Sequence, residues 1–158
     1  MNLPPSDQSP SSLKEVSKSW QLLFVSWLIA LTSTLAVLFI GEIMGQTPCV
    51  LCWYQRAFMF PLVIVLGVSC ILSDLRVWRY ALPVAGAGWA FAAYHMLLIV
   101  EVIPTSIEPC GQGPSCSGTD MMILDVVPIP LLSLGAFSTL IILLLLVRKR
   151  SGPCPNKN

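Results

Sequence analysis

Four long apolar stretches account for most of the chain, and the charged side chains are confined to the segments between and beyond them. The stretches without any Asp, Glu, Lys or Arg are Gln21–Gly41, Ala57–Ser73, Tyr80–Val100 and Val126–Val147. A helix that crosses the hydrocarbon core of a membrane needs about 20 apolar residues, and it satisfies its backbone hydrogen bonds internally. The pattern therefore predicts an all-α polytopic membrane protein, a bundle of four transmembrane helices.

The predicted bundle forms a single domain over residues 20–149. Its spans are expected at about 21–43, 55–73, 80–100 and 123–147. Residues 1–19 are predicted to form a disordered tail, because the first part of this segment is rich in Pro and Ser, and residues 150–158 form a second tail. The first apolar run is longer than the roughly 7–15 residues of a signal-peptide core and lacks a clear cleavage site, so it is expected to remain as an anchor.

The composition agrees with a membrane protein. Of the 158 residues, 55% are hydrophobic and 11% are charged, whereas soluble domains carry about 25% charged residues. The mean hydropathy is +0.77. This composition excludes a soluble domain and a disordered chain. A net charge of +1 without a long basic run also excludes a nucleic-acid-binding protein.

The basic residues predict which ends of the helices face the cytoplasm. Eight of the nine Lys and Arg residues lie before the first span, between the second and third spans, or after the fourth span. Arg56 is the exception. Because loops rich in Lys and Arg stay on the cytoplasmic side, both termini are predicted to be cytoplasmic. Two short extracytoplasmic loops, Glu42–Arg56 and Glu101–Asp125, then connect the helices.

This topology sorts the six cysteines. Two close pairs occupy the outer loops, on the side of the membrane where disulfides persist. They are Cys49 with Cys52 and Cys110 with Cys116. Cys70 lies within the second span and is expected to be an inert core thiol. Cys154 lies in the C-terminal tail, where a reduced cysteine without a role is expected.

Three roles are open to the two outer pairs. They can form structural disulfides in a tetraspan protein without redox turnover, bind zinc as four thiolates, or exchange electrons. A disulfide across C-x-x-C closes a very small loop and therefore stabilises a fold least. The same spacing is typical of redox centres, and an oxidising compartment competes with metal for the thiols. Redox activity is therefore favoured, and no metal is predicted.

The first pair runs directly into the second span, because Cys49 and Cys52 are followed at once by Trp53, Tyr54, Gln55 and Arg56. Cys52 is predicted near a helix N-terminus, where the helix dipole stabilises a thiolate. Arg56 comes four residues later on the same helix face, so its guanidinium can stabilise that thiolate or hold an electron-rich ligand. The alternative is that Arg56 only extends toward the lipid headgroups.

His95 is the only histidine, and it lies in the third span, six residues before Glu101. This position places it in the outer leaflet, at a depth similar to that of Arg56. An ionisable residue inside a span is costly and often functional, although an ordinary interhelical hydrogen bond is the alternative. Together with the neighbouring C-x-x-C, Arg56 and His95 predict a pocket for a membrane-soluble ligand with carbonyl oxygens, such as a quinone.

The second pair, Cys110 and Cys116, belongs to a loop rich in Gly and Pro, which predicts flexible turns. A disulfide in an exposed loop is accessible to an attacking thiolate. The two pairs therefore suggest a relay, in which the exposed pair meets a protein and the pair at membrane depth meets a ligand.

These motifs resemble the DsbB family of disulfide-bond formation proteins, and most closely its shorter BdbC-type branch. The resemblance covers about residues 19–149: four spans, the C-x-x-C-W-Y-Q-R motif at 49–56, His95, and the Pro-Cys and Cys-Ser-Gly segments around Cys110 and Cys116. It implies a protein-disulfide oxidoreductase of the bacterial cytoplasmic membrane, with its active cysteines on the periplasmic or extracytoplasmic side. The family reoxidises a DsbA-like thioredoxin-fold thiol oxidase and passes the electrons to a membrane quinone, ubiquinone or menaquinone.

The resemblance also implies a role for each cysteine. Cys110 would form the mixed disulfide with the partner, and Cys116 would exchange with Cys49. Cys52 would act as the thiolate that faces the quinone, supported by Arg56. His95 would line the quinone site.

Overall fold

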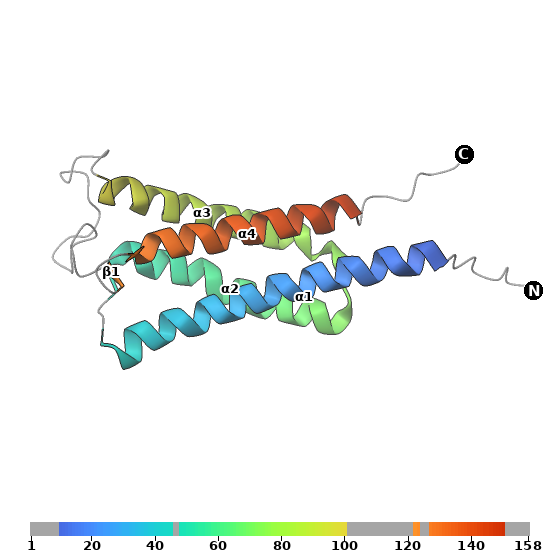
Figure 1. Ribbon diagram of the computed structural model, residues 1–158, viewed down its shortest axis with the longest axis horizontal. Coiled ribbons are helices and arrows are strands. Elements are labelled where there is room, and N and C mark those ends of the chain that lie inside the picture. The colour runs from blue at the N-terminus through green and yellow to red at the C-terminus, as the bar shows by residue number, and fades with distance from the viewer. Residues whose placement is uncertain (1–9, 46–47, 101–121, 124–126, 151–158) are drawn as a thin grey trace, which may run out of the picture.

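Four long antiparallel helices form the molecule (Figure 1). The computed structural model describes residues 10–45, 48–100, 122–123 and 127–150. The helices are α1 (Pro10–Leu38), α2 (Val50–Leu72), α3 (Trp78–Ile99) and α4 (Ile129–Arg150). All four are long and apolar enough to cross a membrane. The predicted four-helix transmembrane bundle is therefore confirmed.

Short elements connect the long helices. A π-helix, η1 (Phe39–Ile43), continues α1, and a 3-10 helix, η2 (Leu75–Val77), lies between α2 and α3. Two strands of two residues each, β1 (Met122–Ile123) and β2 (Val127–Pro128), pair in antiparallel register immediately before α4. Apart from these two short strands, the described elements are helical, as the sequence predicts.

The helix starts differ from the predicted spans in three of the four helices. α1 begins at Pro10, so the prediction of a disordered tail fails for residues 10–19. Pro fits the first turn of a helix, and the Leu, Lys and Glu residues that follow are good helix formers, so the helix extends beyond the apolar run. α2 begins at Val50 and not at residue 55, because Arg56 is buried within the bundle and does not end the helix. α4 begins at Ile129 and not at residue 123, because Pro128 favours extended backbone at Val127, whereas Pro130 is tolerated in the first turn of the helix.

Each helix packs against two neighbours, since α1 and α3 both contact α2 and α4. The main core runs along the bundle axis and includes Leu62 and Leu66 of α2 together with Phe137 and Leu140 of α4. Cys70 is buried in this same core, as expected for a structural thiol.

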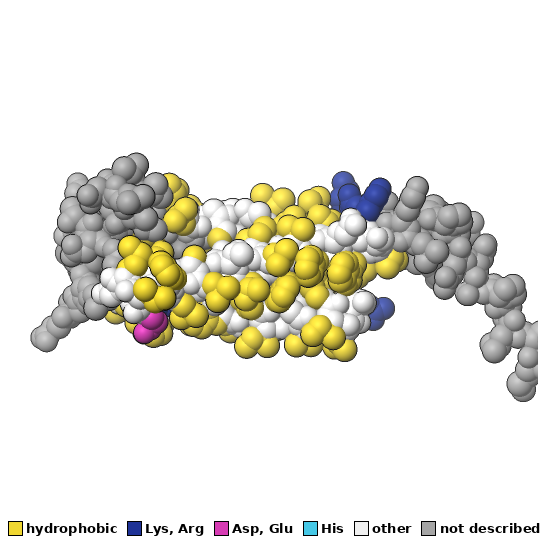
Figure 2. Space-filling model, turned by 60° about the horizontal axis from the view of Figure 1, so that its bottom comes forward, with side chains coloured by type: hydrophobic (Ala, Val, Ile, Leu, Met, Phe, Trp, Pro, Cys, Tyr) yellow, Lys and Arg dark blue, Asp and Glu magenta, His cyan; other side chains and the backbone are white. Residues whose placement is uncertain are grey.

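The two ends of the bundle differ in charge. The first residues of α1 and the last residues of α4 lie at the same end (Figure 1). Figure 2 shows Lys and Arg side chains gathered at the end where α4 finishes, and an acidic side chain toward the opposite end, with an apolar surface between them. The start of α2, which carries the first cysteine pair, lies at the end away from the basic cluster (Figure 1).

Candidate functional site

The first cysteine pair forms the N-terminus of α2. Cys49 is the N-cap residue, with extended backbone, and its sulfur accepts a hydrogen bond from the backbone N–H of Cys52 at 3.3 Å. A sulfur thus takes the place that a Ser or Asp oxygen usually has in a helix cap. Cys52 lies in the first turn, as the sequence predicts. The hydrogen-bonded cap position, however, belongs to Cys49, so the partial positive charge of the helix end acts first on that sulfur.

The two sulfur atoms of this pair are in contact. Cys49 Sγ and Cys52 Sγ lie 3.1 Å apart, and the two cysteines are not joined by a disulfide bond. A disulfide bond is about 2.05 Å long, so only about 1 Å of movement separates this dithiol from the oxidised form. Dithiol and disulfide are therefore interchangeable here without refolding of the helix.

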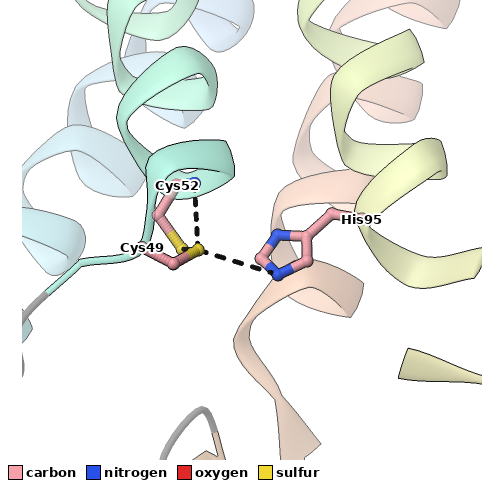
Figure 3. A group of neighbouring side chains, drawn as sticks. All are labelled: Cys49, Cys52 and His95. Atoms are coloured by element: carbon pink, nitrogen blue, oxygen red, sulfur yellow. Dashed lines mark hydrogen bonds between the residues drawn. The ribbon is translucent and has the colours of Figure 1, made fainter. Parts of the chain in front are cut away.

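His95 of α3 faces the pair (Figure 3). Its Nε2 atom lies 3.8 Å from Cys49 Sγ, and its side chain is fully buried. On the other side of the ring, Nδ1 lies 3.0 Å from the side-chain amide of Gln55, which is also buried. The Gln55 amide fixes the ring plane, so that Nε2 points at the cysteine sulfur.

These contacts lower the pKa of the Cys49 thiol to about 4. The largest cause is the hydrogen bond from the Cys52 side chain, followed by the opposing effect of burial; the His95 contact and the Cys52 backbone N–H lower the pKa further. Cys49 lies just outside the span that begins at Val50. Whereas the sequence points to Cys52 as the thiolate, the geometry of the reduced pair favours the thiolate at Cys49.

Arg56 is held between α2 and the end of α1. Its Nη2 donates to the backbone oxygen of Val37 at 3.2 Å, and its guanidinium lies 5.5 Å from the centre of the Trp53 ring. The side chain is only 9% exposed. This burial contradicts the alternative in which Arg56 merely extends toward lipid headgroups.

Gly41, in the π-helix, leaves the room that the Arg56 guanidinium occupies. A Cβ atom at position 41 would lie 2.8 Å from Nη2 of Arg56. Within the described part of the chain, the buried Nε atom of Arg56 has no hydrogen-bond partner. The π-helix and its glycine thus accommodate a buried guanidinium that has one donor unused by the described residues.

Arg56 and His95 contact different neighbours of α2. Arg56 lies against α1 and η1, whereas His95 reaches the cysteines from α3. Their common pocket therefore stays a prediction. Aromatic rings line the α2–α3 side: Tyr54 stacks on Phe91 with ring centres 5.0 Å apart, and Phe58 stacks on the same ring at 5.4 Å.

Comparison with known proteins identifies the family of the chain. The family model described as "Disulfide bond formation protein DsbB" matches residues 18–147, nearly the whole bundle. The chain belongs to this family. A "Probable disulfide formation protein" of Metapseudomonas resinovorans is 55% identical over 136 residues, which cover 85% of this chain and 94% of that protein.

Two further relatives come from distant bacteria. "Disulfide bond formation protein C" of Bacillus subtilis (strain 168) is 39% identical over 80% of this chain and 91% of its own length. A "Probable disulfide formation protein" of Chlamydia muridarum is 38% identical over 80% of this chain and 92% of its own length. No solved structure matches the chain. This DsbB-family chain is therefore a multi-pass bacterial membrane protein and a disulfide oxidoreductase with a role in disulfide bond formation.

Gln55 is one residue of the DsbB-family site whose role the sequence alone does not predict. It belongs to the motif at 49–56, and its contact with His95 places it beside the cysteine pair. The signal in the sequence is a polar amide in a helix that is mostly apolar. The second pair, Cys110 and Cys116, and the tail residue Cys154 lie outside the described residues, so the predicted relay between pairs stays a prediction.

Proposed function

We propose that this protein is a membrane thiol:quinone oxidoreductase that reoxidises a DsbA-like thioredoxin-fold thiol oxidase, and so sustains disulfide formation in extracytoplasmic proteins. The main support for this proposal is the contact of Cys49 Sγ with both Cys52 Sγ and His95 Nε2 at the start of a membrane-spanning helix. A pair in such a position is suited to exchange with a protein thiol on one side and with a lipid-soluble oxidant on the other.

The proposed reaction conserves two electrons and two protons. A thiolate of the reduced partner attacks Cys110 and breaks the Cys110–Cys116 disulfide, and the partner's second thiol then releases the oxidised partner. The freed Cys116 thiolate attacks Cys49 and breaks the Cys49–Cys52 disulfide, which leaves Cys52 as a thiolate. When Cys110 and Cys116 re-form their disulfide, the Cys49–Cys52 pair holds both electrons as a dithiol.

The quinone is the substrate that takes up these two electrons and two protons and leaves as quinol. Arg56 fits such a ligand, because its buried Nε has no partner and a guanidinium readily donates to a carbonyl oxygen. Trp53, beside the guanidinium, adds an aromatic surface. The residues present therefore suit either ubiquinone or menaquinone.

In the proposed reaction, His95 stabilises the thiolate of Cys49 by a hydrogen bond. When Cys49 becomes the leaving thiolate, a proton on His95 Nε2 can hydrogen-bond to its sulfur over the 3.8 Å contact. Gln55 holds the ring in that orientation from the other side. The pair of contacts stabilises Cys49 as a thiolate and so favours its departure from a mixed disulfide.

We also propose an orientation. The start of α2 faces the periplasm or the extracytoplasmic space, and the basic end, with both termini, faces the cytoplasm. The support is the collection of Lys and Arg side chains at one end of the bundle, away from the cysteine pair (Figure 2).

The alternative is that the protein has only a structural role in the membrane and is stabilised by disulfides. The position of the first cysteine pair argues against this role. Cys49 and Cys52 are the N-cap and the first turn of one helix, so a disulfide between them connects no two elements of the fold. Such a bond adds little stability, whereas its sulfurs are well placed for exchange.

The direct test uses the purified full-length protein in detergent, a short-chain quinone and a reduced thioredoxin-fold thiol oxidase. Quinone absorbance should fall with the protein present, and Cys49→Ala and Cys110→Ala should each abolish the decrease. Cys70→Ala, in the core far along α2, is the matched control and should retain turnover. Quinone reduction that persists in Cys49→Ala, or none with any quinone and partner tried, would contradict the proposed function.

A further inference from the structure

The reduced redox pair also has the donor set of a metal site. The sulfurs of Cys49 and Cys52 and a ring nitrogen of His95 all lie within 4.8 Å of one another (Figure 3). The sequence alone suggests only a zinc site with four cysteine ligands, two from each outer loop. The fold instead brings a histidine from α3 to the first cysteine pair.

The distances suit a tetrahedral ion. With metal–sulfur bonds of about 2.3 Å and metal–nitrogen bonds of about 2.0–2.1 Å, neighbouring donor atoms lie roughly 3.5–3.8 Å apart. Cys49 Sγ and His95 Nε2 are 3.8 Å apart. The two sulfurs, at 3.1 Å, need to separate by about 0.7 Å. The Cys52 sulfur lies within 4.8 Å of the His95 ring nitrogen and needs to approach it by at most about 1.3 Å. Side-chain movements of about 1 Å therefore bring three ligands around one ion.

Gln55 gives His95 the outer contact that metal-bound histidines usually have. Its side-chain amide lies 3.0 Å from Nδ1. When the amide oxygen faces the ring, Nδ1 carries the proton and Nε2 presents its lone pair to the sulfurs. The amide can turn either way, so the same contact serves the redox form and the metal-bound form.

Charge favours a divalent ion of the zinc class. Two thiolates and a neutral imidazole around such an ion make a complex with no net charge. Cys49 and His95 are fully buried, where an uncompensated charge is costly. Binding replaces the remaining thiol protons by the metal and changes no oxidation state, whereas the disulfide form has no thiolates to offer.

We propose that the reduced Cys49–Cys52 pair and His95 bind a thiophilic divalent cation of the zinc class, and that this ion inhibits the protein by holding the pair reduced. The ion and the disulfide exclude each other, because both need the same two sulfurs. Metal binding does not depend on the proposed quinone reaction, although the inhibition does.

The test uses Co²⁺ as a spectroscopic probe on the reduced full-length protein under anaerobic conditions. Cys110→Ser and Cys116→Ser are introduced together, so that only the first pair can contribute outer thiolates. We expect one Co²⁺ per protein, with thiolate-to-cobalt charge transfer, intense tetrahedral d–d bands, and displacement by Zn²⁺. Cys70→Ala is the matched control and should leave these spectra unchanged.

Three variants locate the ligands. Cys49→Ser should lower the charge-transfer band by at least half, because only Cys52 can then supply a thiolate, and His95→Ala should shift the d–d bands as the nitrogen donor is lost. Gln55→Leu should keep the spectrum and weaken affinity by roughly ten- to hundredfold, as expected when the partner of a ligating histidine is removed. Absence of the band in the reduced parent, or identical spectra in the parent and His95→Ala, would overturn the proposed site.

Turnover measurements on protein with all four outer cysteines separate this inference from the proposed function. If the protein oxidises its partner but binds no Co²⁺, only the metal site is refuted. If it binds Co²⁺ through these ligands but oxidises no partner with any quinone, the metal site stands and the oxidoreductase function is refuted. Turnover that Zn²⁺ leaves unchanged under conditions where the site is filled would refute the inhibition.

Discussion

Cys49 concentrates several stabilising contacts on one sulfur. It caps α2, accepts from the Cys52 backbone N–H at 3.3 Å, touches the Cys52 sulfur at 3.1 Å and faces His95 at 3.8 Å. Each contact favours the charged form of the thiol, and together they outweigh full burial, which opposes it. The hydrogen bond from the Cys52 side chain contributes most, and the His95 contact and the cap N–H add to it, so that Cys49 rather than Cys52 carries the charge.

The reduced pair should therefore hold a thiolate in mildly acidic solution. The pKa of Cys49 is lowered to about 4, so its thiolate persists above that pH and is protonated as the pH falls through it. The ultraviolet thiolate absorbance, taken as the difference from Cys49→Ala in the reduced protein, measures this titration. Cys52→Ala removes the largest cause and should move the midpoint upward. A midpoint near the value of a free cysteine, about 8.5, in the parent protein would show that the contacts do not act as described.

Gly41 is the residue on which the position of Arg56 depends most directly. A Cβ at position 41 would lie 2.8 Å from Nη2, so Gly41→Ala should push the guanidinium away from its place beside η1. Because the displaced atom is the end of a flexible side chain, the fold should survive. In the proposed reaction we expect the KM for quinone to rise about three- to tenfold, the value of one hydrogen bond of roughly 1 kcal/mol, with partner-thiol exchange retained. Gly86→Ala, where a Cβ meets nothing within 4 Å, is the control. An unchanged KM for quinone in Gly41→Ala would show that Arg56 does not contribute to quinone binding.

At the scale of the elements, α3 and α4 are held together by a close approach at Gly88. A Cβ at this position would overlap the ring of Phe137, which is fully buried in the main core. Small residues of this kind let membrane helices pack closely. Gly88→Ala should therefore cost about 1–3 kcal/mol of stability through overpacking, seen as a lower melting temperature of the detergent-solubilised protein. Gly86→Ala, two residues earlier on the same helix, should not lower it. Equal melting temperatures for the two variants would show that α4 can move away from this contact without loss of stability.

The helices were predictable from sequence to different degrees. Stretches without charge located all four spans, because the membrane excludes charged side chains and exposed backbone. Charge could not locate the helix ends. α1 extends back to Pro10 through residues with good helix propensity, and α2 begins at Val50, although the charged Arg56 follows within its second turn. Pro128 favours extended backbone immediately before α4. The π-turn that accommodates Arg56 has no sequence signal beyond Gly41.

The residues of the site were also predictable from the sequence to different degrees. Cys49, Cys52, Arg56 and His95 stand out in the sequence, because thiols and ionisable groups in or beside a span need a reason. Their partners do not stand out, since they depend on how far each helix is rotated about its axis. That rotation turns Gln55 toward His95 and Arg56 toward α1, although the two residues are adjacent in the chain.

At the scale of the whole molecule, the asymmetry of charge predicts how the bundle lies in the membrane. Basic side chains gather at the end that holds the start of α1 and the finish of α4, while the cysteine pair lies toward the other end (Figures 1 and 2). Lys and Arg near the ends of spans keep those ends in the cytoplasm.

A fluorescent protein that matures only in the cytoplasm should therefore fluoresce when fused after Arg150. A phosphatase that folds only outside should be active when fused after Gly45, between η1 and α2. Replacing Arg148, Lys149 and Arg150 together by Gln removes the strongest basic cluster and should lower the first signal more than the second, because Lys18, Arg76 and Arg79 still hold the other ends. The opposite pair of signals in the unmodified protein would place the cysteines in the cytoplasm, where reduction would keep the pair as a dithiol and exclude the proposed oxidase reaction.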